Sequence, residues 1–181
     1  RSVSRGLGDV YKRQTKALKK IFKLFSFLAI TLNISSESIK LNDADILTNP
    51  LPLPYNAEIY NSSDLDNFID SSIDSQKQPI IIFGANWCPD CRIFSGTIEM
   101  NSVKKFTDKN FNIMYIDVGR YDKNMNLIEY FDIPPSEGIP RVLVFNLNRE
   151  IINNSTTTEW RTARDRTSQE IFNFFQIMAK N

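Results

Sequence analysis

The sequence predicts an α/β domain with a central mixed sheet of four or five strands and helices on both faces. Three observations lead to this prediction. An unbroken apolar run at 80–83 is typical of a buried strand, capping sequences at 63–66 and 167–170 mark two helix starts, and helical and strand patterns alternate between them. The chain has 181 residues, 41% of them hydrophobic, which is enough for one buried core.

The domain is expected to begin with a short edge strand at 57–60. Ser63-Asp-Leu-Asp66 has the form of a capping box, so an amphipathic helix is predicted over 64–74. The helical spacing is carried by Leu65, Phe68, Ile69 and Ile73. A proline then separates this helix from the strand at 80–83, whose apolar residues indicate burial on both faces.

The remaining elements follow from the same two periodicities. They are expected in the order helix 89–100, a further helical stretch 103–107, strand 113–118, short helix 126–131, strand 141–145, a candidate fourth strand 151–153 and a final helix 171–178. Proline at position 89 suits a first helical turn, because its missing N–H would have no partner there.

The N-terminal region is interpreted as two segments outside the domain. Residues 1–14 resemble translated sequencing-adapter sequence, and we interpret them as a sequencing or translation artefact. Residues 15–38 contain four lysines, the apolar run 24–32 and then small residues, which is typical of a secretory signal peptide. The signal is either cleaved or retained as an anchor, and an amphipathic first helix is the alternative. We therefore expect an exported protein, periplasmic or secreted.

The rest of the chain is predicted to form one domain preceded by a linker. Residues 39–56 are polar with three prolines, so they are expected to be extended. Residues 57–181 form the predicted domain, and we expect a monomer. Export would place the protein in a compartment where disulfides form and persist.

Composition excludes several functional classes. Residues 1–38 hold eight basic and two acidic side chains, whereas the other 143 residues hold 14 basic and 19 acidic ones. This net acidic body argues against nucleic-acid binding. The chain has no histidine and only two cysteines, so a Ser-His-Asp triad is excluded and one chain cannot supply a four-ligand zinc site. We expect no metal and no cofactor.

The two cysteines carry the chemistry that the sequence predicts. Cys88 precedes Pro89 at the expected helix start, where free backbone N–H groups and the helix dipole favour a thiolate. Cys91 lies about one helical turn further on, within disulfide reach. One thiolate can attack a disulfide and the other can resolve the product. A structural disulfide and half of an intermolecular metal site are the alternatives.

The segment 80–91, IIIFGANWCPDC, resembles the strand, turn and helix start of the thioredoxin superfamily. A second motif, Gly138-Ile-Pro140 before the strand at 141–145, matches the cis-proline loop of that fold. The longer pattern is most similar to bacterial exported "thioredoxin family" proteins with a WCPDC active site. The resemblance covers residues 57–181.

This resemblance implies a role for each matching residue. Cys88 is the attacking cysteine, Cys91 is the resolving cysteine, and Pro140 is the cis-proline. Ile139 would offer backbone hydrogen bonds to an extended substrate segment, as in strand addition. Trp87 would shield the disulfide and contact the substrate.

One departure from the family concerns the proton of the resolving thiol. The family has a buried acid six residues before the first cysteine, and this chain has Ile82 there. Proton transfer to and from Cys91 therefore needs another route, for which Asp90, Asp117 or water are the candidates.

The direction of electron flow is predicted from charge. Asp90 adds negative charge near the attacking thiol and should raise its pKa, which favours a reductase, whereas Arg92 acts in the opposite sense. The expected partners are protein disulfides and a membrane electron donor. The alternatives are a disulfide oxidase or isomerase, or a binding module of the same fold with a structural disulfide.

A polar cluster follows the strand at 113–118. It consists of Asp117, Arg120, Tyr121 and Asp122. Although function often lies at strand ends, we expect this cluster to be a solvated loop.

Overall fold

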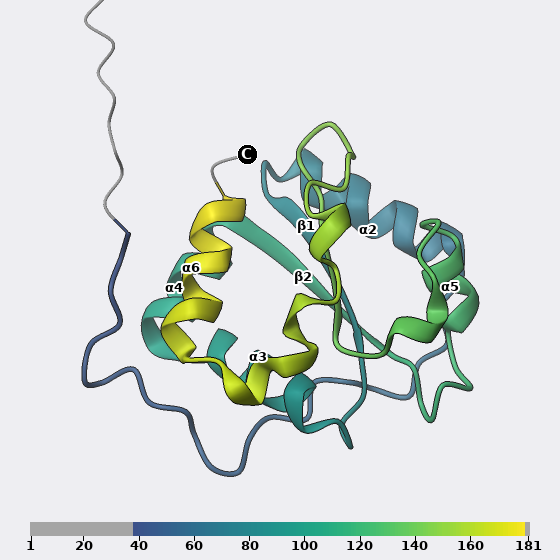
Figure 1. Cartoon of the computed structure of the whole chain (residues 1–181). Helices are drawn as coiled ribbons and strands as arrows, with labels where there is room; N and C mark the ends of the chain where they lie inside the picture. Colours follow the sequence, from purple (N-terminus) through teal and green to yellow (C-terminus); the bar gives the residue numbers. More distant parts are fainter. Residues whose placement is uncertain (1–37, 180–181) are drawn as a thin grey trace, which may run out of the picture. The chain divides into compact units, whose positions relative to one another are not determined.

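The structure is a computed structural model that describes residues 38–179. The expectations for residues 1–14 and 15–37 lie outside the described residues. The elements, shown in Figure 1, are α2 (Ser62–Asp74), β1 (Gln78–Gly84), α3 (Pro89–Ile98), α4 (Asn101–Asn110), β2 (Phe111–Asp117), α5 (Met125–Glu129), η1 (Pro135–Glu137), β3 (Arg141–Val144), η2 (Asn154–Thr156), η3 (Glu159–Asp165) and α6 (Ser168–Met178). No helix within 38–179 is long and apolar enough to cross a membrane.

The sheet is mixed, as predicted, but it has three strands among the described residues rather than four or five. The strand order is β2-β1-β3, with β2 parallel and β3 antiparallel to β1. Every residue of β1 is buried, because strands flank it on both sides and helices cover both faces. The α/β class with helices on both faces is confirmed, and only the number of strands was overestimated.

The expected fourth strand at 151–153 is replaced by a side chain. Ile151 forms only an isolated bridge to Phe145. Beyond it, the amide of Asn153 donates to the carbonyl of Val142 at 2.8 Å and accepts from the N–H of Val144 at 2.9 Å. Backbone hydrogen bonds pair the other groups of this edge, from the N–H of Ile152 to the carbonyl of Val144 and from the N–H of Val142 to the carbonyl of Thr157. The outer edge of β3 is thus satisfied without a further strand.

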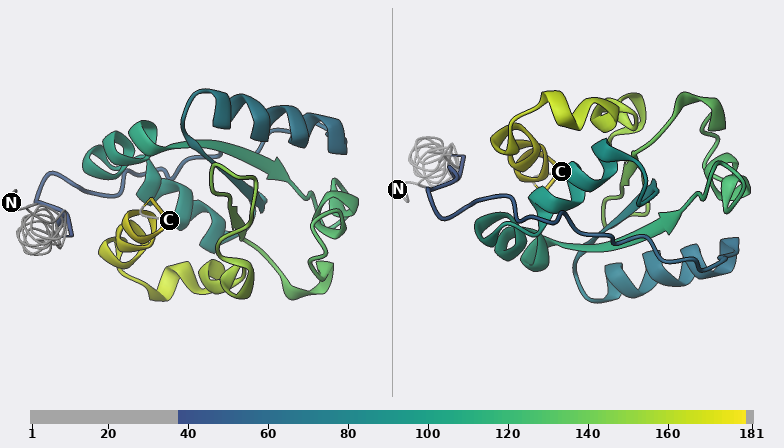
Figure 2. Two further views of the ribbon diagram at one scale, coloured as in Figure 1. Left: turned by 90° about the horizontal axis from the view of Figure 1, so that it is seen from above. Right: turned by 90° about the horizontal axis from the view of Figure 1, so that it is seen from below.

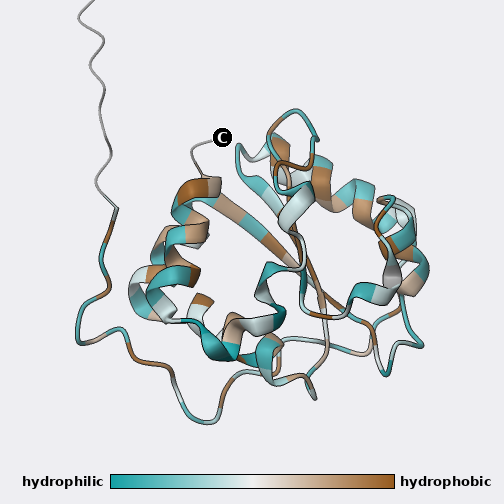
Figure 3. Ribbon diagram, viewed as in Figure 1, coloured by the Kyte–Doolittle hydropathy of each residue, from teal (hydrophilic) through white to brown (hydrophobic). Residues whose placement is uncertain are grey.

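Two layers of helices enclose the sheet. Figure 2 shows α2 on one face and α3, α4 and α6 on the other. On the second face, Phe94 of α3 packs against Trp160 and Phe175, with ring centroids 5.5 and 5.6 Å apart. Figure 3 shows hydrophilic and hydrophobic residues on the same helices, as expected for helices with one buried side.

The helix starts agree only partly with the predicted capping boxes. Thr167 and Glu170 cap α6 as predicted. The capping box of α2 is instead formed by Asn61 and Asp64, two residues before the expected one. Asparagine caps a helix about as well as serine, so the two sequence positions could not be separated.

Residues 38–60, here called the strap, contain no helix or strand and extend along the domain (Figure 1). Their contacts involve a series of elements. The N–H of Ile39 donates to Gln176 of α6, Asp45 accepts from the first turn of α4, and the carbonyl of Leu51 accepts from Arg92 of α3. The segment predicted as a linker is thus packed against the domain.

The strap also contains residues 57–60, where we expected an edge strand. That prediction is wrong. The side chain of Asn124 donates to the carbonyl of Glu58 at 3.0 Å and accepts from the N–H of Tyr60 at 3.0 Å. The same side chain donates to the carbonyl of Asp117 at the end of β2. It therefore joins the strap to the sheet without a strand ladder.

Candidate functional site

The turn from β1 into α3 holds the first cysteine at a helix start. The N–H of Cys88 donates to the carbonyl of Ala85 at 3.0 Å, which closes the turn. Cys88 has extended backbone angles and is the N-cap of α3, and Pro89 occupies the first helical turn. This is the arrangement that the sequence predicted, because proline in the first turn costs no hydrogen bond.

The helix brings the two thiols into one buried site. The Sγ of Cys88 accepts a hydrogen bond from the N–H of Cys91 at 3.2 Å, in the manner of a capping side chain. Both thiols are free. Cys88 retains 4% of its surface and Cys91 retains none. The two sulfur atoms therefore have unequal access to a partner.

The pKa values of the two thiols move in opposite directions. Hydrogen bonds from the side chain and the backbone N–H of Cys91 lower the pKa of Cys88 to about 7, although burial and the charge of Asp90 oppose them. Burial raises the pKa of Cys91, and its interaction with Cys88 raises it further. Near neutral pH a large fraction of molecules therefore holds one thiolate and one thiol, which is the state needed for disulfide exchange.

The loop before β3 meets the site from the opposite side. The Ile139–Pro140 peptide bond is cis. The carbonyl oxygen of Ile139 lies 3.9 Å from the Sγ of Cys88, so the structure brings together these two residues from the two predicted motifs. Behind the loop, the buried Arg141 donates to the carbonyl of Pro134 at 3.1 Å, which ties the loop to β3.

Trp87 forms the exposed rim of the site, with 41% of its surface accessible. Its indole N–H donates to the carbonyl of Gly119, and its ring meets that of Tyr121 edge to face, with centroids 5.9 Å apart. The guanidinium of Arg120 stacks over the indole, 4.9 Å from the centroid. Arg120 and Tyr121, two members of the polar cluster that we expected to be a solvated loop, thus belong to the rim.

The acids suggested as proton carriers are both engaged elsewhere. Asp90 is buried and accepts from the backbone N–H of Arg164 at 2.9 Å and from its side chain at 3.1 Å. Asp117 accepts from the N–H of Gly119. Ile82 is fully buried, as expected of a central strand residue, and offers no proton.

Tyr55 of the strap is a site residue that sequence reasoning missed. Its side chain is buried, and Tyr55 and Cys91 each shift the pKa of the other, which indicates that the hydroxyl lies near the buried thiol. The side chain of Asn86, in the turn before Cys88, holds the backbone of Tyr55 through hydrogen bonds of 3.2 and 2.7 Å. Pro52 and Pro54, which precede Tyr55 in the sequence, indicated an extended segment, but no local pattern connected Tyr55 with the two cysteines.

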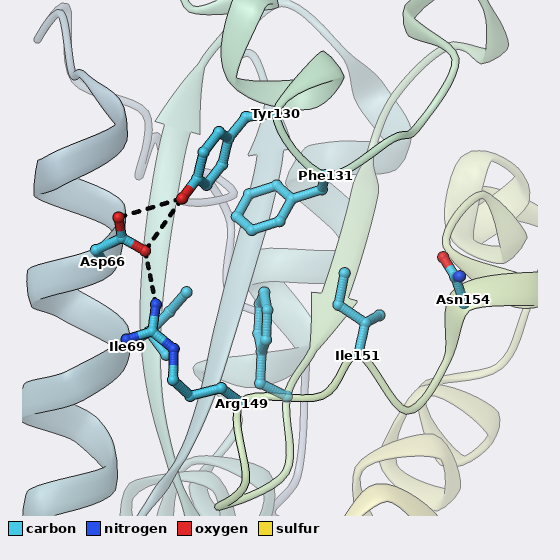
Figure 4. Close-up of a pocket in the computed structure, with 8 residues that line it drawn as sticks. Asp66, Ile69, Tyr130, Phe131, Arg149, Ile151 and Asn154 are labelled. Carbon is cyan, nitrogen blue, oxygen red and sulfur yellow. Dashed lines mark hydrogen bonds and ion pairs between the residues drawn. The ribbon is translucent and has the colours of Figure 1, made fainter.

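A shallow pocket of about 490 Å³ lies beside the cis-proline loop and the rim. It is lined by Tyr121, Met125, Ser136 and Gly138. A second pocket, of about 500 Å³, lies between α2 and the loops around β3 (Figure 4). There Asp66 accepts from Tyr130 and Arg149, and no cysteine is present. The first pocket adjoins the rim at Tyr121 and the cis-proline loop at Gly138.

Among residues 38–179, no group of three or more Cys, Asp or Glu side chains is placed to hold a metal ion. The described part of the site therefore offers the two thiols, their hydrogen-bond donors and the rim as its chemical groups. With these groups, the site can exchange a disulfide with another molecule through Cys88.

Comparisons with known proteins agree with this geometry. A family model described as thioredoxin-like matches residues 60–146, which include Cys88 and Cys91. A disulphide isomerase from Xylella fastidiosa Temecula1 is 29% identical over 70% of this chain and 97% of its own, with a TM-score of 0.63. No curated protein sequence matches the chain.

Two further solved structures are more distant. The thioredoxin Deadhead from Drosophila melanogaster is 19% identical over 69% of this chain and 98% of its own, with a TM-score of 0.44. The C-terminal domain of DsbD from Neisseria meningitidis, in its oxidised form, is 20% identical over 61% of this chain and all of its own, with a TM-score of 0.41. The matching family model and the fold show that this chain carries a thioredoxin-like domain.

Proposed function

We propose that this protein is a thiol–disulfide oxidoreductase that reduces protein disulfides through Cys88 and Cys91. The observation that carries the proposal is the unequal pair at the start of α3. Cys88 has a pKa of about 7 and faces the loop at Ile139, whereas Cys91 is fully buried with a raised pKa. The order of events follows from this inequality.

In the first step, the Cys88 thiolate attacks one sulfur of the substrate disulfide. A bond forms between Cys88 and that sulfur, and the other substrate sulfur leaves with the electron pair and takes a proton from solvent. In the second step, Cys91 loses its proton and attacks the Sγ of Cys88. The Cys88–Cys91 disulfide forms, the second substrate thiol is released, and the substrate has gained two electrons.

The rim and the loop supply a place for the substrate chain. An extended segment could add to the backbone of Ile139 beside Pro140, with Trp87 covering the exchanging sulfurs. Tyr121 and Gly138 line the shallow pocket next to this track, which has room for one side chain near the substrate cysteine. Pro89 and Asp90 support the site, because they begin α3 and link it to η3.

The reducing direction is supported by charge. Asp90 raises the pKa of Cys88 against the hydrogen bonds that lower it. A thiolate that is less stabilised makes the disulfide form a weaker oxidant. The signal-like segment 15–38 supports export, and an exported reductase needs electrons from a membrane donor. An oxidase would run the same steps in reverse, and an isomerase would attack and be released again with no net transfer of electrons.

Trapping experiments test the proposed activity. Changing Cys91→Ser should leave attack intact and block resolution, so mixed disulfides with protein substrates should accumulate on non-reducing gels. Cys88→Ser is the matched control and should trap nothing. The absence of adducts with Cys91→Ser would favour a binding module.

The reduction potential tests the direction. We expect the Cys88–Cys91 couple to have a reduction potential of about −270 mV, the value of a reducing thioredoxin. The fluorescence of Trp87 in dithiol buffers of graded potential measures it. A reduction potential of about −120 mV, typical of a strong oxidase, would contradict the proposal that the protein is a reductase.

A further inference from the structure

We propose that Tyr55 of the strap is a catalytic residue of the resolving step, in which its buried hydroxyl donates a hydrogen bond to the sulfur of Cys91 and stabilises the attacking thiolate. This inference deepens the proposed function and rests on it. Tyr55 precedes the residues 60–146 that match the thioredoxin-like family model.

The position of the hydroxyl is the first argument. Tyr55 is 4% exposed, and its hydroxyl makes no hydrogen bond of ordinary geometry with another described residue. A buried hydroxyl without a partner is costly, so its placement calls for an explanation. Burial and the neighbouring Cys91, Tyr115 and Cys88 raise the pKa of this hydroxyl, and of these neighbours Cys91 is itself fully buried.

The surroundings hold the ring in this position. The backbone N–H and carbonyl of Tyr55 both bond to the side chain of Asn86, and its ring packs edge to face on Tyr115 with centroids 5.4 Å apart. The ring also lies directly over Gly84. A Cβ at Gly84 would be 2.8 Å from Cε1 of the ring and closer still to the hydroxyl oxygen. Glycine at this position therefore leaves the space that the tyrosine occupies.

The chemistry of the resolving step requires such a donor. Cys91 must lose a proton in an apolar interior, where an unpaired thiolate is strongly disfavoured. Ile82 is apolar, and Asp90 and Asp117 bond to other groups. A hydroxyl that donates to the thiolate lowers the pKa of Cys91.

Tyr55 is suited to donate and not to accept a proton. Burial and the neighbouring thiols raise its own pKa, so it keeps its proton throughout the physiological range. The proton of Cys91 therefore passes to solvent and not to the tyrosine. In the same step the Cys88–substrate bond breaks, the Cys88–Cys91 bond forms, and the substrate sulfur leaves with the electron pair.

A two-phase reaction separates the two thiols in one experiment. The reduced protein is mixed with dithiobis(nitrobenzoic acid), an aromatic disulfide. Attack by Cys88 releases one coloured thiolate, and attack by Cys91 on the mixed disulfide releases the second. We expect Tyr55→Phe to leave the first phase unchanged and to slow the second about tenfold at neutral pH, the size of one hydrogen bond to a charged group.

The pH profile distinguishes this role from packing. The midpoint of the second phase should move to higher pH in Tyr55→Phe, and the two proteins should converge where Cys91 is ionised in both. Tyr115→Phe is the matched control, because it removes a hydroxyl from the same cluster, and it should change neither phase. Since Tyr55→Phe removes a buried hydroxyl that has no ordinary hydrogen bond, its thermal unfolding midpoint should not fall below that of the wild type.

The proposal would be overturned if Tyr55→Phe and the wild type had the same rate and the same pH midpoint in the second phase. It would also be overturned if Tyr115→Phe slowed the second phase as much as Tyr55→Phe does. The proposed function fails separately. If the wild type releases both equivalents but Cys91→Ser traps no protein substrate, the role of Tyr55 in resolution stands and the function on protein disulfides does not.

Discussion

Cys88 and Cys91 are three residues apart in the sequence, yet they belong to two different environments. Cys88 faces a rim made of exposed and polar groups, namely Trp87, the loop after β2 and the carbonyl of Ile139. Cys91 points into the core beside Tyr55 and retains no accessible surface. One turn of α3 separates the two environments.

The difference shows how a symmetric pair of thiols acquires an order of reaction. At the rim, hydrogen bonds outweigh burial and lower the pKa of Cys88. In the core, burial dominates and raises the pKa of Cys91. The first sulfur is therefore ionised in a large fraction of molecules at neutral pH before any substrate arrives, and the second becomes a nucleophile only when the mixed disulfide forms beside it.

The largest expected effect comes from testing each thiol alone. In Cys91→Ala, the remaining Cys88 loses the hydrogen bond from the Cys91 side chain but keeps the one from the backbone N–H, so it should still react with iodoacetamide, although more slowly than in the wild type. In Cys88→Ala, the remaining Cys91 should react at least about a hundredfold more slowly at pH 7, because it is buried and almost wholly protonated. Alkylation rates followed by mass spectrometry measure both.

The same experiment gives a pH dependence. A lowered pKa means that the Cys88 thiolate is lost as the pH falls, so the alkylation rate of the reduced wild type should be half-maximal near pH 7. Comparable rates for the two single-cysteine proteins at pH 7 would contradict the division between rim and core.

The second effect concerns the core side alone. Gly84→Ala places a methyl group against the ring of Tyr55, and overpacking of this kind costs about 1–3 kcal/mol of the free energy of unfolding. Denaturant unfolding measures it, and the second phase of the disulfide reaction should slow as Tyr55 is displaced. The first phase should persist.

Gly96→Ala is the matched control on α3. A methyl group there meets the ends of the Leu51 and Leu47 side chains, which can move. Alanine is also favoured over glycine within a helix. The stability of Gly96→Ala should therefore stay close to that of the wild type, and equal losses in the two variants would show that the ring of Tyr55 is not a rigid neighbour.

The same contrast explains which parts of the site could be predicted. Cys88 and its helix start are encoded locally, by an apolar strand, a turn and a proline within a short stretch. The cis-proline loop could be recognised because Gly138-Ile-Pro140 precedes a strand in the family order. Tyr55 carries no such signal, because its role depends on a contact made by a proline-rich segment that has neither helix nor strand.

Errors in the predicted fold have a related cause. The expected strands at 57–60 and 151–153 both contain residues that suit a sheet edge. In each place an asparagine side chain, Asn124 or Asn153, satisfies the backbone groups that a strand would have paired. Patterns of apolar residues predict which backbone is buried, but they do not show whether another backbone or a side chain completes its hydrogen bonds.

The smallest expected effect tests the charge at the rim side. Asp90→Asn removes a negative charge that raises the pKa of Cys88, so the midpoint of its alkylation profile should fall. Arg164→Gln is the matched opposite, because it removes the cation that neutralises Asp90, and its midpoint should rise. The second phase of the disulfide reaction should keep its own pH midpoint in both variants, since Cys91 is governed by the core. If the pH midpoint of the second phase shifted as much as that of Cys88 alkylation, the charge of Asp90 would act on both thiols alike. The order of reaction would then come from the unequal access of the two thiols to solvent rather than from charge.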